Sequence, residues 1–549
     1  MAYTNADEAP ESPETAASDS GPTLTETRPE ASREAHAMAA ATAPESAETA
    51  KNAGTAETTS SRRRFPTFPP RWSLQTYGPW LLVAGLMTVY LLISLARFYR
   101  FAPTSWDLGL FTEEVKQYAH FHAPIDDARS PGYEILGEHF SPIVALIGPF
   151  FLIFPTPVTL LVAQAFLFAV AAVPIVRFGA ERISTGAGYA LGAAYGLSFG
   201  LAEAIDADFH EIAFAVPLIA FSMCAMLRGK HMAAALWALP LLLCKEDLGI
   251  TVVLPIGIAL ILYGRTLLGA VLSAAGTAGS LLAIYWIIPA LNPTHQYEYW
   301  NKGGCADPTQ PGGAKPITCL IGQSMQNAGG KLELIFLLLA ITAFVALRSP
   351  LVLFAVPNLG SRFITTNSTF WGTTWHYNAI LMPILFVAAA DGIVRARTAG
   401  ALPDLAGAVR RGARRVSMAM SNHGAVAMLA VSLALVQQFP YNQLFDPNTF
   451  TFDARTQALS HAMSLVPDGV TVETTINMLA PLSARDDTFW VGNPAGPTAP
   501  EYVVFDQVVS GFSPPITDVP GFEQQRHPGA TYKVIYEDGF GIYVLRKTS

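Results

Sequence analysis

Charged residues are scarce in this chain. Only 14% of its 549 residues are Asp, Glu, Lys or Arg, while 51% are hydrophobic. Soluble globular domains carry about 25% charged residues, so this composition favours a protein that spans a membrane several times. The chain also lacks a basic patch with interleaved aromatic residues, which argues against nucleic acid as a partner. We therefore expect the lipid bilayer to be its main environment.

Cysteine is rare as well, with four residues in the chain. Cys224 and Cys244 lie within apolar runs, where a thiol usually serves as an inert packing group. Cys305 and Cys319 flank a loop rich in Gly and Pro. These two residues are a candidate disulfide if the loop lies outside the cytoplasm, where disulfides persist.

The sequence also lacks the short motifs of several large enzyme classes. It has no His-Glu-x-x-His metal spacing, no Walker loop, no glycine-rich dinucleotide fingerprint and no nucleophile elbow. Each of these motifs positions a metal ion, a phosphate or a nucleophile for its class. Their absence removes support for ATP-driven transport and for hydrolases of those kinds.

Large aliphatic and aromatic side chains are nearly missing from residues 1–60, which are rich in Ala, Glu, Thr, Ser and Pro. Such a segment cannot bury enough surface to offset the entropy lost on ordering. It has no apolar run typical of a signal peptide, and a basic cluster at 62–64 precedes the first apolar run. Basic residues beside a span mark its cytoplasmic side. We therefore predict that residues 1–72 form a disordered cytoplasmic tail.

Long apolar runs dominate residues 73–439. A span needs about 20 apolar residues, and Lys or Arg in short loops marks the cytoplasm, so we predict about eleven transmembrane helices. The arginine-rich segment 395–415 is the strongest cytoplasmic marker. The run 142–154 is short and contains Pro142 and Pro149, which predicts a re-entrant or interfacial helix. The predicted spans are 79–96, 158–176, 187–202, 212–227, 232–244, 248–264, 267–289, 332–347, 350–364, 378–394 and 423–438.

The composition changes after residue 439, where the last predicted span leads outward. The run 454–465 predicts a short helix, and Asp538-Gly539 predicts the turn of a closing hairpin. We therefore expect residues 440–549 to form a small extracytoplasmic α/β domain. Its predicted strands are the β-rich runs 469–476, 502–509, 532–537 and 541–546.

The predicted topology places most of the unusual titratable residues on the extracytoplasmic side. Ionisable groups at membrane depth are costly unless they face water, a partner or a substrate. The densest stretch is 206–211, between two apolar runs, and its alternative interpretation is a polar loop between two helices. We predict one shared site from these candidates: Asp107, Glu138, His139, Asp208, His210, Glu211, Lys245, Glu246, Asp247 and His376.

Two of these residues have distinct chemical roles to offer. Asp107 is a candidate base, although Asp is also a preferred N-cap and a helix is expected to start near Leu108. Lys245 is a candidate ligand for phosphate, although a lysine at a helix end can also extend its ammonium group to the membrane interface.

The remaining candidates would bind rather than react. His139, taken alone, is more typical of an interfacial residue than of a ligand, and His376 suits either role equally. Asp208, His210 and Glu211 are candidates to position sugar hydroxyls or to hold a divalent metal ion, because mixed imidazole and carboxylate ligands suit manganese, zinc or magnesium.

Several short motifs, in this order, resemble those of a known family. The chain resembles the bacterial family of predicted membrane proteins called domain of unknown function 2079 and, more distantly, the C-type glycosyltransferases that use polyprenyl-phosphate sugars. The resemblance implies a multi-pass protein of the bacterial plasma membrane, with a catalytic aspartate in the first outer loop that maps onto Asp107. The motifs are Trp106-Asp107-Leu108-Gly109-Leu110-Phe111, Gly137-Glu138-His139-Phe140-Ser141-Pro142, Asp208-Phe209-His210-Glu211, Lys245-Glu246-Asp247 and His376-Tyr377.

The resemblance and the topology lead to one main hypothesis. The protein would transfer a hexose or pentose from a polyprenyl-phosphate carrier to an extracytoplasmic glycan, lipid or protein. Asp107 would act as base or orient the acceptor, and Lys245 would hold the donor phosphate. Two alternatives remain open: a transporter or flippase of a lipid-linked cell-envelope intermediate, and a non-catalytic membrane scaffold.

Overall fold

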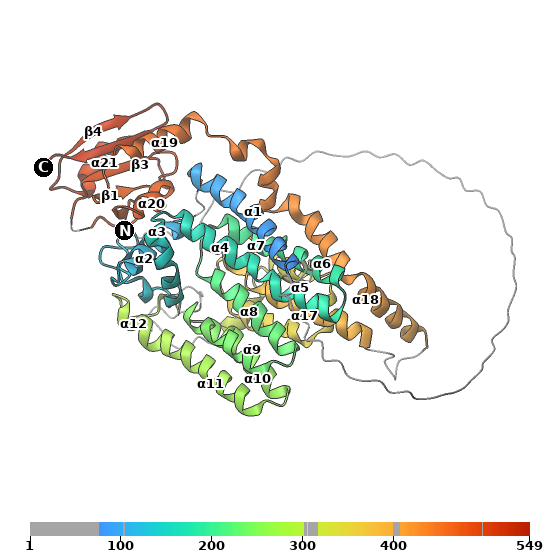
Figure 1. The fold of residues 1–549 in the computed structure, drawn as a ribbon. Coiled ribbons are helices and arrows are strands. Elements are labelled where there is room, and N and C mark those ends of the chain that lie inside the picture. Colours follow the sequence, from blue (N-terminus) through green and yellow to red (C-terminus); the bar gives the residue numbers. More distant parts are fainter. Residues whose placement is uncertain (1–75, 103–104, 301–304, 306–316, 399–406, 497) are drawn as a thin grey trace, which may run out of the picture. The chain divides into compact units, whose positions relative to one another are not determined.

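Helices and strands occupy different parts of the chain. The computed structural model describes residues 76–549, except for 103–104, 301–304, 306–316, 399–406 and 497. The predicted tail at 1–72 and its basic cluster lie outside the described residues. Among the residues described, the named strands all follow residue 439, and the chain before it is helical (Figure 1). The structure thus agrees with a mostly helical fold and a small C-terminal sheet.

Most helices of the first part are short. Helical backbone satisfies its own hydrogen bonds, which is why it suits an apolar environment. Helix α17 is largely enclosed, since every residue from Leu381 to Ile393 is buried. The helices are α1 (Gly78–Tyr99), α2 (Asp107–Ala119), α3 (Gly148–Ile153), α4 (Val158–Val170), α5 (Ala172–Arg182), α6 (Thr185–Gly196), α7 (Phe199–Asp206), α8 (Ile212–Leu227), α9 (His231–Ala238), α10 (Leu254–Leu262), α11 (Thr266–Leu282), α12 (Ile288–Leu291), α13 (Ile317–Met325), α14 (Ala328–Ala340), α15 (Ala355–Phe363), α16 (Ser368–Trp371), α17 (Leu381–Thr398) and α18 (Gly407–Leu435).

Fewer helices have the length of a membrane span than the sequence predicts. Among the residues described, four helical stretches are long and apolar enough to cross a membrane. A fifth results if the pair Ser368–Asn378 and Leu381–Thr398, bent by 73°, counts as one span. Helix length alone therefore identifies four or five spans and does not confirm the predicted number of about eleven. The four are Gly78–Tyr99, Val158–Arg182, Thr266–Leu291 and Arg415–Gln438.

Local breaks explain the difference. The predicted span 187–202 is divided between α6 and α7, and Ser198 is the N-cap of the second helix. The predicted span 350–364 begins as a tight helical turn, Pro350–Phe354, before α15 starts. Hydropathy does not register such breaks, because the residues on both sides of them are equally apolar. The run from Pro142 to Ile153 is a short apolar helix, below the length of a span.

The C-terminal part contains a five-stranded mixed sheet with the order β2-β1-β3-β5-β4. Strand β1 pairs in parallel with β2 and β3, and β5 pairs antiparallel with β3 and β4. The elements are α19 (Ala454–Ser464), β1 (Thr471–Thr474), α20 (Ile476–Ser483), β2 (Asp487–Trp490), β3 (Tyr502–Asp506), α21 (Val519–Arg526), β4 (Tyr532–Glu537) and β5 (Ile542–Lys547).

The predicted strands and the first helix of this part correspond to observed elements, whereas β2, α20 and α21 were not predicted. Strand β2 has only four residues and starts at Asp487, so it lacks the apolar alternation of a typical strand. The closing hairpin connects β4 and β5 as expected. Its left-handed residue is Gly541, at φ +77°, and the Asp538 carboxylate accepts the backbone N–H groups of Phe540 and Ile542 at 2.9 and 3.2 Å.

Helix α2 of the first part packs against α20 of the C-terminal part (Figure 1). Gly109 makes the close approach possible, because a Cβ atom there would lie 2.7 Å from Cδ2 of Leu479. The Lys116 ammonium donates to the backbone oxygen of Asp486 at 2.7 Å. Since α2 begins at Asp107, this contact fixes the helix that carries the candidate base.

Candidate functional site

Asp107 is the first residue of α2, and the structure does not use it as a cap. The N-cap is Trp106, which makes no side-chain capping bond. The Asp107 carboxylate instead accepts a hydrogen bond from the Ser105 hydroxyl. Its Oδ2 atom also lies 3.4 Å from Nε2 of His210. The capping interpretation therefore fails, and the carboxylate faces another candidate residue.

His210 is positioned by a turn that a buried amide holds in place. Asp208 has a left-handed backbone with φ +65°, a conformation that is uncommon outside glycine. Gln164 of α4 donates to the Asp208 backbone oxygen at 2.8 Å and accepts the His210 N–H at 3.1 Å. Gln164 was not predicted as a site residue. The sequence signal that could have found it is a lone amide inside an otherwise apolar run, and in the structure Gln164 is buried.

The Asp107–His210 pair favours its charged form. Burial alone would raise the pKa of Asp107, but the adjacent His210 and the more distant Lys245 hold it below its usual value. Burial likewise opposes the charge on His210, but Asp107 raises the pKa of the imidazole above its usual value. The Asp107 carboxylate and the His210 imidazolium, 3.4 Å apart, therefore each stabilise the charged form of the other.

The imidazole of His376 completes this side of the site. Its ring lies 3.7 Å, centroid to centroid, from the ring of His210, and the Tyr377 ring follows at 4.2 Å. Arg362 of α15 organises this segment by donating to the Tyr377 backbone oxygen at 3.1 Å and to the Asn378 side-chain oxygen at 2.9 Å. Arg362 is a second residue that the sequence did not single out, because a lone arginine near a helix end is usually an interfacial group.

Lys245 does not extend freely to an interface. Its ammonium group lies 2.7 Å from Oε1 of Glu211, the residue before α8, and the glutamate side chain is 2% exposed. Burial opposes the charge of both groups, yet Lys245 holds the pKa of Glu211 below its usual value and Glu211 raises that of Lys245. Because an ammonium has three N–H donors, this pair leaves Lys245 able to bind a further anion.

His139 and Glu246 form a third charged pair, next to the pair of Lys245 and Glu211. Nδ1 of His139 is 2.8 Å from Oε1 of Glu246, which also accepts the Tyr297 hydroxyl at 2.9 Å. Although burial opposes ionisation, His139 and Lys245 lower the pKa of Glu246 to about 2. The next carboxyl group behaves differently: burial and the charge of Glu246 raise the pKa of Asp247 to about 6.

Two candidate residues have other surroundings. Glu138 pairs with Arg129 at 2.7 Å, so it belongs to the framework of the segment between α2 and α3. Asp208 lines a cavity together with Ser105, the partner of Asp107, and with Asn477 of α20. The predicted metal ligands Asp208, His210 and Glu211 are not among the groups of described residues whose ligand atoms converge. The structure thus brings together Asp107, His139, His210, Glu211, Lys245, Glu246, Asp247 and His376.

The cysteines divide as the sequence suggested. Cys305 and Cys319 form a disulfide that closes the loop between α12 and α13. Cys224 and Cys244 are free and buried. Tyr297, which precedes Cys305 in the connection after α12, donates a hydrogen bond to Glu246 in the candidate site.

The fold is similar to that of a solved C-type glycosyltransferase. ArnT from Cupriavidus metallidurans bound to undecaprenyl phosphate matches with a TM-score of 0.51 and 12% identity, over 86% of this chain and 98% of that one. The Archaeoglobus fulgidus oligosaccharyltransferase in the apo form gives a TM-score of 0.37 and 13% identity, over 76% of this chain and 65% of that one. The same enzyme tethered to an acceptor peptide gives 0.36 and 12%, over 87% and 74%. The likeness to ArnT establishes the fold alone.

A protein-family model covers most of the chain. No curated protein matched the sequence. The model described as "predicted membrane protein (DUF2079)" matches residues 97–525, a segment that includes all the candidate site residues. The chain therefore belongs to the DUF2079 family of predicted membrane proteins.

Proposed function

We propose that the protein is a membrane glycosyltransferase that moves a sugar from a polyprenyl-phosphate carrier to an acceptor outside the cytoplasm. The observation that carries the proposal is the 3.4 Å contact between Asp107 and His210, within interaction range of the Lys245 ammonium. A carboxylate near an ammonium group that keeps N–H donors for a further anion suits a reaction in which a hydroxyl attacks and a phosphate departs. The C-type fold provides the setting in which such a reaction is known.

In the proposed reaction, an acceptor hydroxyl forms a bond to the anomeric carbon of the donor sugar. The bond from that carbon to the phosphate oxygen breaks, and polyprenyl phosphate leaves with the bonding electron pair. Asp107 accepts a hydrogen bond from the attacking hydroxyl and takes its proton as the new bond forms. Because His210 keeps this carboxylate ionised, its main contribution is to orient the hydroxyl, with proton transfer late in the step.

Lys245 is assigned the departing phosphate. Glu211 neutralises the ammonium in the resting protein, and the remaining N–H groups would turn to the phosphate when the donor binds. The negative charge on the phosphate increases as the bond breaks, so a fixed cation stabilises the transition state more than the bound donor. His139 and Glu246 lie on the same side and are proposed to contact sugar hydroxyls.

The divalent ion that the sequence suggested is not needed for this proposal. Among the residues described, its candidate ligand atoms do not form a converging group, and Glu211 is paired with Lys245. We therefore derive no step through a metal ion at these residues. Treatment of the purified protein with a chelator tests metal dependence directly.

The proposed topology follows from the same assignment. We propose that the shorter apolar helices complete a set of about eleven spans in a bacterial plasma membrane, with the N-terminus in the cytoplasm. The site and the C-terminal sheet would then lie on the outer side. Single cysteines introduced at exposed Phe121 and at exposed Lys230, between α8 and α9, should react with a membrane-impermeant thiol reagent from outside and from inside, respectively.

The reaction is tested with purified full-length protein, radiolabelled polyprenyl-phosphate hexoses and pentoses, and a bacterial cell-envelope extract that supplies the acceptor hydroxyls. Wild-type protein should release free polyprenyl phosphate, and Asp107→Asn should not. Asp468→Asn, which removes an exposed surface carboxylate, is the matched control and should retain activity. Movement of the intact carrier across proteoliposomes, without release of sugar, would instead identify a transporter. Retained function in Asp107→Asn cells would support the scaffold alternative.

A further inference from the structure

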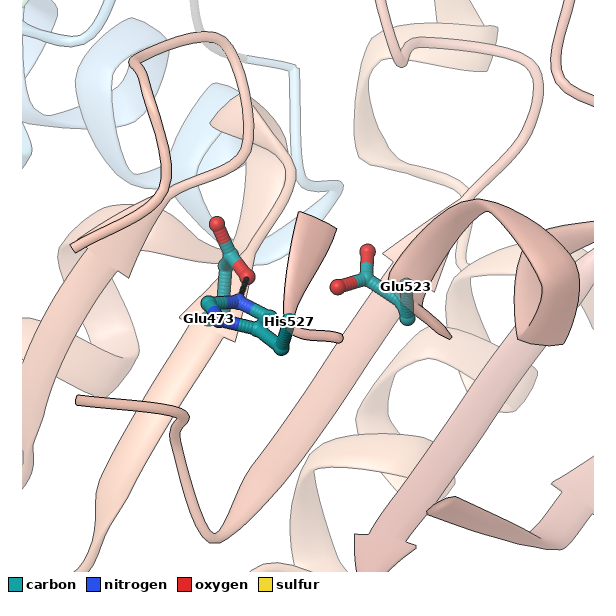
Figure 2. Close-up of side chains that lie close together, drawn as sticks. All are labelled: Glu473, Glu523 and His527. Carbon is teal, nitrogen blue, oxygen red and sulfur yellow. Dashed lines mark hydrogen bonds and ion pairs between the residues drawn. The ribbon is translucent and has the colours of Figure 1, made fainter. Parts of the chain in front are cut away.

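A second cluster of titratable side chains lies in the C-terminal sheet, outside the candidate site. It consists of Glu473 on β1, Glu523 on α21 and His527 directly after α21. One ligand atom from each residue lies within 4.8 Å of the other two, and all three residues are buried. Figure 2 shows the Glu523 carboxylate pointing toward His527, whose ring contacts Glu473.

One carboxylate of the cluster, that of Glu523, accepts no hydrogen bond from the residues described. Oε2 of Glu473 lies 2.8 Å from Nε2 of His527, and its Oε1 accepts from Arg526. Glu523, by contrast, is 0% exposed, and neither of its carboxylate oxygens receives a hydrogen bond from a described residue. A buried carboxylate in that condition must either stay protonated or be neutralised by a cation.

The local sequence directs these groups to one point. Glu523 and His527 are four residues apart at the end of one helix, so their side chains lie on the same face of it. Glu473 approaches from the neighbouring strand, and its flanking residues Val472 and Thr474 point to the opposite face, as alternation along a strand requires. Two ligands from a helical turn and one from a strand surround a common centre.

We propose that Glu473, Glu523 and His527 bind a divalent transition-metal ion, with zinc as the best match. One imidazole nitrogen and two carboxylate oxygens are typical zinc ligands, and three protein ligands leave a fourth position for water. On binding, the contact between His527 and Glu473 opens and both atoms turn to the ion. Arg526 remains on the other oxygen of Glu473 and orients it.

The structure also indicates how the ion would reach the site and what it would stabilise. A pocket beside Glu473 and His527 is lined by Asp127 of the first outer loop and Trp490 of β2. Arg526 donates to the Asn493 backbone oxygen at 3.0 Å. The Asn493 amide in turn donates to two backbone oxygens of that outer loop, both at 2.7 Å. The ion would therefore strengthen the attachment of the sheet to the loop that leads to the candidate site.

The test uses full-length protein in detergent, stripped with a chelator and then titrated with Zn²⁺ alone. Metal content after desalting and the thermal unfolding midpoint are the two readouts. Wild-type protein should bind about one more Zn²⁺ per chain than Glu523→Gln, and Zn²⁺ should raise the unfolding midpoint of wild-type protein only. Glu523→Gln keeps the shape of the side chain, so it should fold. X-ray absorption should report one imidazole and carboxylate oxygens around the ion.

Controls separate this site from others in the chain. His461→Gln removes an exposed histidine from the same part of the protein and should bind Zn²⁺ like wild type, whereas His527→Gln should not. The proposal is overturned if wild-type protein takes up no Zn²⁺, or if Glu523→Gln binds it with equal stoichiometry and affinity. In that case Glu523 is a protonated acid, since burial and Glu473 raise its pKa to about 9. None of these readouts depends on sugar transfer.

Discussion

The Asp107 carboxylate and the His210 imidazole lie 3.4 Å apart, although Asp107 begins α2 and His210 lies between α7 and α8. Ser105 holds the first group, and the Gln164 amide holds the turn that carries the second. The pair is therefore preorganised by residues that would not themselves contact a substrate. Its charges and its position determine several measurable properties.

Asp107→Asn should lower kcat by about 10²–10⁴-fold, the range for a positioned proton acceptor. The amide retains the size of the carboxylate and can still bond Ser105, so donor binding should change little. Release of polyprenyl phosphate at saturating donor measures kcat, and binding of labelled donor measures affinity. A variant that keeps more than about one tenth of the wild-type kcat would exclude Asp107 from the chemical step.

His210→Gln should shift the pH dependence of the reaction. Burial raises the pKa of Asp107, and His210 is the main opposing influence; without the imidazolium, Asp107 becomes protonated at a higher pH. The acid limb of the kcat/KM profile should therefore move to higher pH. An unchanged acid limb would mean that another group governs it.

Asp107 and His210 both stabilise the fold, and their two contributions are lost at opposite ends of the pH range. The lowered pKa of Asp107 stabilises the fold above its unfolded pKa, and this contribution is lost as the pH falls through the folded value. The raised pKa of His210 stabilises the fold below about pH 6.5, and this contribution is lost as the pH rises through the folded value. Unfolding midpoints of wild type and of the double variant Asp107→Asn/His210→Gln should diverge most between these limits.

Lys245→Gln should cost both stability and activity, for different reasons. It leaves the Glu211 carboxylate buried without its cation, which costs about 3 kcal/mol for a buried pair. Adding Glu211→Gln should restore most of the unfolding midpoint because no unpaired charge remains. Activity should stay low in the double variant, since the phosphate ligand is still missing. Recovery of both properties together would show that Lys245 has only a structural role.

Gly109→Ala tests the contact between α2 and α20. The new Cβ would lie 2.7 Å from Leu479, and overpacking of this kind costs about 1–3 kcal/mol. Leu479→Ala leaves a cavity and should also destabilise. The double variant should be more stable than the sum of the two changes implies. Strict additivity of the unfolding midpoints would show that these helices do not pack in this way.

The sequence predicted most of the site because charge stands out in an apolar chain. Asp107, His210, Lys245 and His376 were identifiable on that ground, and the structure places them together. Gln164 was missed because the candidates were chosen by their ability to carry charge, which a neutral amide lacks. The pairing of Lys245 with Glu211 was also unpredictable, since it depends on how two distant helix ends approach each other.

The fold was predictable in outline and less so in detail. Apolar runs identified the helical part and β-rich runs identified four of the five strands. Interruptions such as the one before Ser198 were invisible, because composition does not record where a helix restarts. The short elements β2, α20 and α21 were missed for a related reason: their burial comes from contacts with distant segments rather than from a local pattern.

The Asn493 amide, which donates to the backbone oxygens of Ala128 and Arg129, has a consequence for limited proteolysis. Residues 450–454 are exposed and form the covalent connection to the sheet. The sheet is also held by Lys116 at Asp486 and by the ring contact of Trp106 with Trp490, at 4.7 Å. A protease that cuts between residues 450 and 454 should therefore yield two bands on a denaturing gel. On size exclusion the protein should still elute as a single particle, because the C-terminal fragment stays bound through these contacts.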